Sequence, residues 1–130
     1  MLLASSLLVD LVDALNHPLI GACWDSGHAE IQHLDQGSAL RALGPRLKAT
    51  HIQDNDGFAD QHLLPYHGHT DWTAVVGALY DIGYQGAFCY EVHNAIRVLP
   101  DELRDSMLSY AAGLGRHLLR LGLPRSSSEA

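Results

Sequence analysis

The chain has 130 residues with a formal net charge of −7, and 47% of its residues are hydrophobic while 18% are charged. This balance excludes a disordered chain and predicts one packed domain, or one piece of a larger domain. The 8 Lys and Arg residues against 15 Asp and Glu residues argue against a nucleic-acid partner, which binds a clustered basic surface.

Neither the cysteines nor the start of the chain indicates an extracellular or membrane protein. Cys23 and Cys89 lie in apolar runs without metal-binding spacing, so we expect two buried free thiols and a cytoplasmic location. The apolar first residues contain Asp10 and Asp13 and lack an early Lys or Arg. We therefore expect neither a signal peptide nor a membrane span.

Hydrophobic periodicity predicts helices that alternate with short strands. Leu7, Leu8, Leu11, Val12 and Leu15 recur at helical spacing and predict a helix over 7–16 with one apolar face. The other predicted elements, in chain order, are a strand over 19–24, a helix over 38–43 capped by Ser38, a strand over 47–52, a helix over 72–82 capped by Asp71, a strand over 87–92 and a helix over 101–121.

This alternation predicts an α/β fold with a parallel sheet and crossover helices. Three strands are too few to close a barrel, and a parallel sheet is normally covered on both faces. We therefore expect the chain to form part of a larger structure. The residues over 124–130 are expected to be a flexible tail.

Polar side chains recur where each predicted strand ends. Asp25 and His28 follow the first strand, His51 ends the second and Glu91 ends the third. Because parallel strands end at the same edge of a sheet, Asp25, His51 and Glu91 should lie together there. Two carboxylates and an imidazole suit Mn²⁺, Mg²⁺, Co²⁺ or Zn²⁺. Individually, Asp25 as a turn cap, His28 as a hydrogen-bond partner and His51 as a core residue remain alternatives.

A long polar loop follows the second predicted strand. Within it, Asp60 and His62 form a D-x-H pair that is typical of a compact metal clamp, whereas His67 and His69 are expected to be solvated. Loops of this length are often functional. The acidic and imidazole side chains of the loop are Asp54, Asp56, Asp60, His62, His67 and His69.

Four ordered motifs resemble the xylose isomerase-like TIM-barrel superfamily, and within it the sugar phosphate isomerase/epimerase group. The motifs are CWDSGHA, LKATHIQDNDG, DQHLLPYHGHTDW and GYQGAFCYEV. The resemblance extends over 7–121. It implies that residues 1–123 form the C-terminal half of a (β/α)8 barrel, strands six to eight with their helices.

The resemblance also implies a set of metal ligands. In the epimerase branch one divalent metal is held by Glu, Asp, His and Glu, and the last three match Asp25, His51 and Glu91. The first glutamate ends the fifth strand of the barrel, upstream of Met1. The intact enzyme would then act on a ketose or hydroxy-ketone, and Glu91 and the missing glutamate would exchange a proton as base and acid.

Further residues match substrate contacts by the same resemblance. His28 matches a histidine that contacts substrate beside the metal, and Asp54 and His62 are candidate polar contacts. An arginine that binds substrate in some epimerases falls near Gly57 here. We expect the 130-residue chain to be inactive alone and to self-associate through an exposed sheet edge.

Two alternatives remain at this point. The endonuclease IV branch shares the barrel and cleaves abasic DNA with three zincs, and Asp60 and His62 match two of its ligands. The low basic charge argues against that reading. The other alternative is a non-catalytic remnant that only binds metal or a partner chain.

Overall fold

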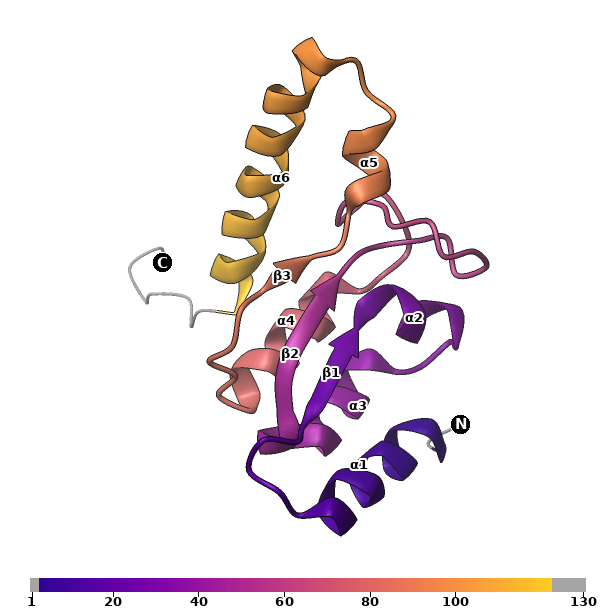
Figure 1. The fold of residues 1–130 in the computed structure, drawn as a ribbon, viewed down its shortest axis with the longest axis vertical. Coiled ribbons are helices and arrows are strands. Elements are labelled where there is room, and N and C mark those ends of the chain that lie inside the picture. Colours follow the sequence, from indigo (N-terminus) through magenta and orange to yellow (C-terminus); the bar gives the residue numbers. More distant parts are fainter. Residues whose placement is uncertain (1–2, 123–130) are drawn as a thin grey trace, which may run out of the picture.

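The computed structural model describes residues 3–122, so the tail expected over 124–130 lies outside the described residues. Helices and strands alternate along the chain (Figure 1). In chain order the elements are α1 Leu3–Leu15, β1 Ala22–Asp25, α2 Ser26–Ile31, α3 Gln36–Leu43, a 3-10 turn Gly44–Arg46, β2 Leu47–Ile52, α4 Trp72–Asp81, β3 Cys89–Tyr90, α5 His93–Arg97 and α6 Asp101–Leu121.

The three strands form one parallel sheet in the order β1-β2-β3, which confirms the predicted α/β topology. A bulge interrupts the first pairing, because Ala22 lies opposite Leu47 whereas Cys23 lies opposite Ala49. Beyond the bulge Asp25 lies opposite His51. The register therefore brings the ends of β1 and β2 level with each other.

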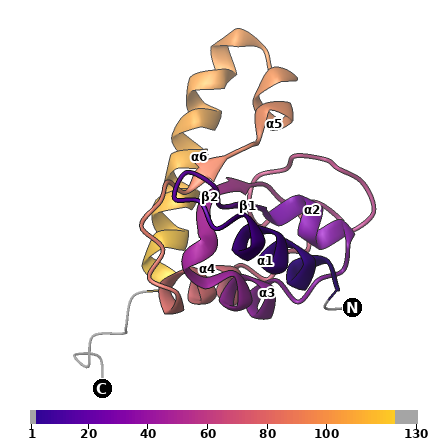
Figure 2. The same cartoon turned by 60° about the horizontal axis from the view of Figure 1, so that its bottom comes forward.

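The core lies between the sheet and a layer of helices. Helices α1, α3, α4 and α6 follow one another along one side of the sheet, each in contact with the next (Figure 2). Alternate strand residues such as Trp24 and Ile52 are buried against this layer. Leu40 and Val75, which are fully buried, come from the helices. One face of the sheet is thereby covered.

The opposite face of the sheet is open to solvent. Cys23, Ala49, His51 and Cys89 alternate with the buried strand residues and are all exposed. The prediction that both cysteines are buried is therefore wrong. An apolar run does not tell which of its two faces is covered, and among residues 3–122 the helices pack on one face only.

Several elements begin or end away from their predicted bounds. The first strand starts at Ala22 rather than at residue 19, because Leu19 and Ile20 lie in a turn in which the Ile20 N–H donates to the His17 carbonyl, 3.0 Å away. The third strand is only Cys89–Tyr90. The cap of α3 is Asp35, whose carboxylate accepts the Ser38 N–H, so Ser38 is not the cap itself.

The two terminal helices are less buried than their periodicity predicts. Leu7, Leu11 and Leu15 of α1 are exposed, while Leu8 packs against the core. In α6 Leu118 is fully buried and belongs to the core. The N-terminal part of α6 rises beyond the sheet beside α5 (Figure 1). The short helices α2 and α5 have no counterpart among the predicted elements.

Candidate functional site

Asp25 ends β1 and caps α2 at the same time. Its Oδ1 accepts the backbone N–H of His28 at 2.9 Å, which satisfies a free donor in the first turn of the helix. Its Oδ2 lies 3.9 Å from His51 Nδ1 and 3.3 Å from His28 Nδ1. Asp25 is thus both the predicted turn cap, through Oδ1, and the predicted site residue, through Oδ2.

Asp25, His51 and Glu91 meet at the ends of their strands. One nitrogen or oxygen atom of each residue lies within 4.8 Å of the others. The closest pair is His51 Nδ1 and Glu91 Oε2 at 3.0 Å. The side chains are 13%, 49% and 35% exposed in chain order. Carboxylate and imidazole donors at 2.0–2.2 Å are typical around a divalent ion such as Zn²⁺, so this spacing fits one cation after small side-chain movements.

His28 lies beside this cluster, held between two carboxylates. Its Nδ1 faces Asp25 Oδ2 and its Nε2 faces Asp60 Oδ2, each at 3.3 Å. The side chain is 55% exposed. His28 is therefore oriented by its neighbours and still accessible to a ligand.

Asp60 and His62 form a second polar group next to the cluster. His62 Nε2 lies 3.2 Å from Asp60 Oδ2, and His62 Nδ1 lies 2.8 Å from the Glu91 carbonyl oxygen. Both ring nitrogens face acceptors, which the imidazolium satisfies by donating twice. Desolvation works against the charged ring, but the Glu91 carbonyl and the Asp60 charge outweigh it and raise the pKa of His62.

The Asp60 carboxylate is stabilised in its charged form. Partial burial opposes ionisation, but hydrogen bonds with Gln53 and His28 and the nearby charge of His62 together hold the pKa of Asp60 below its usual range. Asp60 Oδ1 accepts from Gln53 Nε2 at 3.0 Å. The D-x-H pair thus forms a network with His28 and Gln53.

Asp54 is placed differently from the other predicted site residues. Its carboxylate is fully buried and accepts the backbone N–H groups of Asn55, Tyr66 and Thr70 and the indole N–H of Trp72. These contacts fold the loop between β2 and α4. Asp54 is therefore a structural residue of this loop, and its buried carboxylate is closed to a substrate.

The two remaining loop histidines lie on the surface. His67 and His69 are both exposed, and His67 Nε2 lies 3.2 Å from the Tyr110 hydroxyl. Neither belongs to the group formed by Asp25, His51 and Glu91.

Gln53 contributes to the site although sequence reasoning did not single it out. Its side chain is fully buried and its amide contacts both Asp25 and Asp60. A Cβ at position 27 would overlap the Gln53 side chain, so Gly27 leaves room for it. A glutamine after a strand has no periodic signature, and only its position inside the motif LKATHIQDNDG gives a hint.

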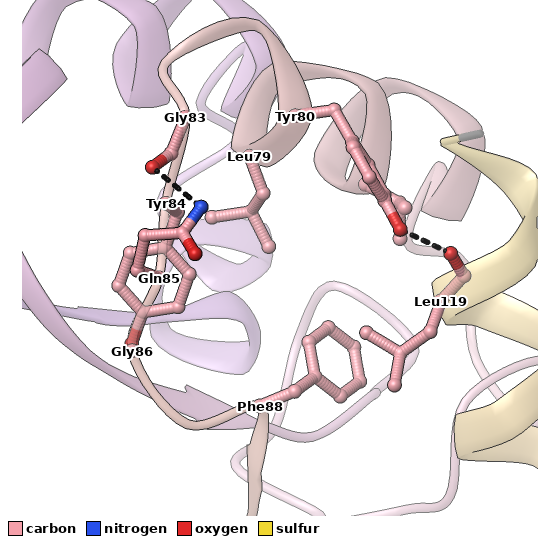
Figure 3. A pocket seen from close by; sticks show the side chains of 9 residues that line it. Leu79, Tyr80, Gly83, Tyr84, Gln85, Gly86, Phe88 and Leu119 are labelled. Atoms are coloured by element: carbon pink, nitrogen blue, oxygen red, sulfur yellow. Dashed lines mark hydrogen bonds between the residues drawn. The ribbon is translucent and has the colours of Figure 1, made fainter. Parts of the chain in front are cut away.

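A separate pocket of about 360 Å³ lies where the chain enters β3, at the sheet end away from Asp25, His51 and Glu91. Figure 3 shows Tyr80 on one side, with its hydroxyl donating to the Leu119 carbonyl, and Phe88 on another. Its lining is largely apolar and aromatic. It lacks the converging charged groups of the strand-end cluster.

Over the described residues, no helix is both long and apolar enough to cross a membrane.

Relatives of known sequence are similar to part of this chain. An uncharacterized protein, y4fM, of Sinorhizobium fredii is 43% identical over 72 residues, which is 55% of this chain and 23% of the relative. The D-psicose 3-epimerase of Enterocloster bolteae is 30% identical over 83 residues, 64% of this chain and 26% of the relative. The aligned part of the chain thus spans about a quarter of the length of these relatives.

Solved structures share the fold. A D-psicose 3-epimerase crystallised in the presence of D-fructose superposes with a TM-score of 0.74 at 20% identity, covering 92% of this chain and 44% of that protein. The D-psicose 3-epimerase of Clostridium cellulolyticum H10 with D-tagatose gives 0.72 at 23% identity, covering 88% and 43%.

The family model of the xylose isomerase-like TIM barrel matches residues 5–112, most of the chain. The parallel sheet, its helix layer and the barrel-like neighbours agree with that match. The chain therefore belongs to the xylose isomerase-like TIM barrel family and has the fold of part of such a barrel.

Proposed function

We propose that the intact barrel is a divalent-metal-dependent sugar isomerase or epimerase that transfers a proton at the carbon beside the carbonyl of a ketose or hydroxy-ketone. Residues 1–123 would supply strands six to eight of that barrel. The observation that carries the proposal is the meeting of Asp25, His51 and Glu91 at the carboxyl ends of three parallel strands. Barrel enzymes place their active sites at this end of the sheet.

Asp25, His51 and Glu91 would hold the metal. Their two carboxylates and one imidazole are donors that suit Mn²⁺, Mg²⁺, Co²⁺ or Zn²⁺. A bound divalent cation supplies Lewis-acid polarisation of the substrate carbonyl. The names of the epimerase relatives support a sugar as the substrate class.

Glu91 would also move the proton. Its side chain is 35% exposed, so a substrate can reach it, and a positioned carboxylate is a common general base. His28 would contact a substrate oxygen through Nε2, with that oxygen replacing Asp60 as the partner of the nitrogen. His62, whose side chain is 12% exposed, would contribute a second polar contact.

One observation favours a second candidate, a zinc phosphodiesterase that acts on abasic DNA. Asp60 Oδ2 lies 3.2 Å from His62 Nε2. Asp60 also contacts His28, and His62 contacts the Glu91 carbonyl, so the pair lies beside the cluster, where further zinc ions would bind. The net charge of −7 counts against a DNA backbone as partner. Metal counting separates the two candidates, since the epimerase proposal requires one metal.

Calorimetric titration of the chain with Mn²⁺ alone tests the metal site. We expect one site per chain and at least about tenfold weaker binding for Asp25→Asn, His51→Gln or Glu91→Gln, because metal affinity is sensitive even to groups that only support ligands. Asp56→Asn is the control, since Asp56 lies in the loop between β2 and α4, outside the cluster, and its carboxylate accepts the N–H groups of Phe58 and Ala59. A wild-type chain without Mn²⁺ affinity, or variants that bind as tightly, would contradict the proposal.

A second measurement tests turnover. The cluster of Asp25, His51 and Glu91 holds one glutamate, whereas the proposed proton exchange uses both a base and an acid. We therefore expect no metal-dependent deuterium exchange into ketoses or ketose phosphates, because an acid or base contributes about 10²–10⁴-fold. Exchange that Glu91→Gln abolishes would show that the chain rebuilds a complete site by itself.

A further inference from the structure

Gln53 has a side chain whose hydrogen-bonding capacity is divided between the metal cluster and the neighbouring loop. It follows β2 directly and is fully buried. Its Nε2 donates to Asp25 Oδ1 at 3.3 Å and to Asp60 Oδ1 at 3.0 Å, and its Oε1 accepts the His62 N–H at 3.2 Å. Only a neutral amide offers two donors and an acceptor in this arrangement.

These contacts divide the two oxygens of Asp25 between different tasks. Oδ1 is held by Gln53 and by the His28 N–H. Oδ2 faces the side chains of His28 and His51, at 3.3 Å from His28 Nδ1 and 3.9 Å from His51 Nδ1. A carboxylate anchored through one oxygen presents the other in a fixed direction, as a single-oxygen metal ligand requires.

The two oxygens of Asp60 also have different partners. Its Oδ1 accepts from Gln53, and its Oδ2 faces Nε2 of both His28 and His62. The amide therefore separates two carboxylates that would otherwise repel each other and links the strand-end cluster to the loop.

We propose that Gln53 is a positioning residue, which fixes Oδ1 of Asp25 and Oδ1 of Asp60 so that Oδ2 of Asp25 points to the metal site and Oδ2 of Asp60 to His28 and His62. This proposal rests on the proposed function, because the metal site is the one formed by Asp25, His51 and Glu91. In this role Gln53 would act through Asp25 and Asp60 and would touch neither the metal nor the substrate.

The backbone of Gln53 is held independently of its side chain. The Ser26 hydroxyl donates to the Gln53 carbonyl at 2.6 Å and accepts the Gln53 N–H at 3.0 Å. A side-chain substitution leaves these two bonds available. Variants at position 53 are therefore suited to test positioning without loss of the local fold.

Gln53→Glu is the most informative variant. It keeps the shape but loses both donated bonds and places a third carboxylate between Asp25 and Asp60. The added negative charge alone would strengthen cation binding, whereas misplacement of Asp25 would weaken it. Gln61→Glu is the matched control, because Gln61 lies in the same loop and its amide contacts Asp56.

The experiment titrates the full chain with Co²⁺ alone and follows binding by calorimetry and by the visible absorption of the bound ion. We expect Gln53→Glu to bind about 10–100-fold more weakly, the range typical of groups that orient ligands, with an altered absorption spectrum. The neutral variant Gln53→Met should show the same direction of change. Gln61→Glu should bind within about twofold of the wild type and keep its spectrum, as substitutions outside the ligand shell do.

The outcomes separate this proposal from the proposed function. Equal or tighter binding by both Gln53 variants, with an unchanged spectrum, would overturn the positioning role alone, even if their melting temperatures fall. A wild-type chain that binds no Co²⁺ would contradict the metal site and the positioning role together. Circular dichroism identifies any variant that fails to fold, in which case the other variant at position 53 decides.

Discussion

Trp72 Nε1 donates to Asp54 Oδ2 across a distance of 3.0 Å, although 18 residues separate the two along the chain. Both side chains are buried, at 2% and 0% exposure. The same carboxylate accepts the N–H groups of Tyr66 and Thr70. A buried charge held by this many donors gives the loop between β2 and α4 one fixed path past the candidate site.

Trp72→Phe should therefore cost about 1.5–3 kcal/mol of unfolding free energy, the value typical of a hydrogen bond to a charged group. Urea unfolding followed by circular dichroism measures it. Trp24→Phe is the control, because the Trp24 indole donates to the neutral Gln36 amide at 3.2 Å, and its loss should cost about 0.5–1.5 kcal/mol on that account. A smaller loss for Trp72→Phe than for Trp24→Phe would contradict the role given to Asp54.

Gly68→Ala should destabilise the same loop. A Cβ at Gly68 would overlap the Asn55 carbonyl and Asp54 Oδ1, and neither backbone nor the anchored carboxylate can easily yield. A fall in melting temperature is expected. At Gly77, inside α4, a Cβ meets nothing within 4 Å, so Gly77→Ala should instead stabilise the protein by about 0.5–1 kcal/mol. Equal effects at the two positions would show that the close approach at Gly68 is unimportant.

The stability of the folded protein should depend on pH in part through His62. Its pKa is raised from 6.5, since the contacts with the Glu91 carbonyl and with Asp60 outweigh the desolvation of the ring. The protonated ring then contributes stability that is fully present below the unfolded pKa near 6.5 and is lost as the pH rises through the folded pKa. NMR titration of the His62 ring should report a pKa above 6.5.

Asp60→Asn should bring that pKa down, because the carboxylate partner of His62 Nε2 loses its charge. Asp56→Asn, in the same loop, should leave the pKa of His62 equal to that of the wild type within experimental error, since Asp56 bonds to Phe58 and Ala59 instead. A wild-type pKa below 6.5 would mean that desolvation prevails.

The open sheet face should be detectable through its thiols. Cys23 and Cys89 are exposed, so both should react with Ellman's reagent without denaturant at low protein concentration. Desolvation and the neighbouring Asp25, Cys89 and Glu91 raise the pKa of Cys23, so its rate should increase with pH beyond neutrality. Two thiols that react only after unfolding would contradict the open face.

We also expect self-association through the sheet, because the edges of β1 and β3 have no strand partner among the described residues. Sedimentation velocity should show an average mass that rises with concentration, and thiol reactivity should fall in parallel if the sheet face is covered. Leu11→Glu tests the exposed surface of α1. Association abolished by Leu11→Glu, with unchanged thiol reactivity, would move the interface from the sheet to that helix.

The cluster of Asp25, His51 and Glu91 was predictable because it needs only two facts, where each strand ends and that the strands are parallel. Neither depends on a residue far away. The buried contacts of Gln53 and Asp54 were not predictable, since they depend on the path of the loop between β2 and α4. Asp54 accepts from Tyr66, Thr70 and Trp72. The Gln53 amide contacts Asp60 and His62.

The prediction that Cys23 and Cys89 are buried failed for another reason. Strand periodicity separates two faces but does not tell which one is covered, and here helices cover one face only among residues 3–122. The solved structures that share the fold are more than twice as long as the part of this chain that matches them.

The bulge near the start of β2 has a consequence for changes in chain length. Lys48 is the extra residue between the two pairings Ala22–Leu47 and Cys23–Ala49. Deleting Lys48 would straighten the ladder and still leave Asp25 opposite His51. An insertion between Ala49 and His51 would instead shift His51 by one position and turn its ring toward the helices. The candidate metal centre should therefore tolerate loss of the bulge residue Lys48 but not a change of length between Ala49 and His51, a contrast that insertions and deletions reveal and point substitutions do not.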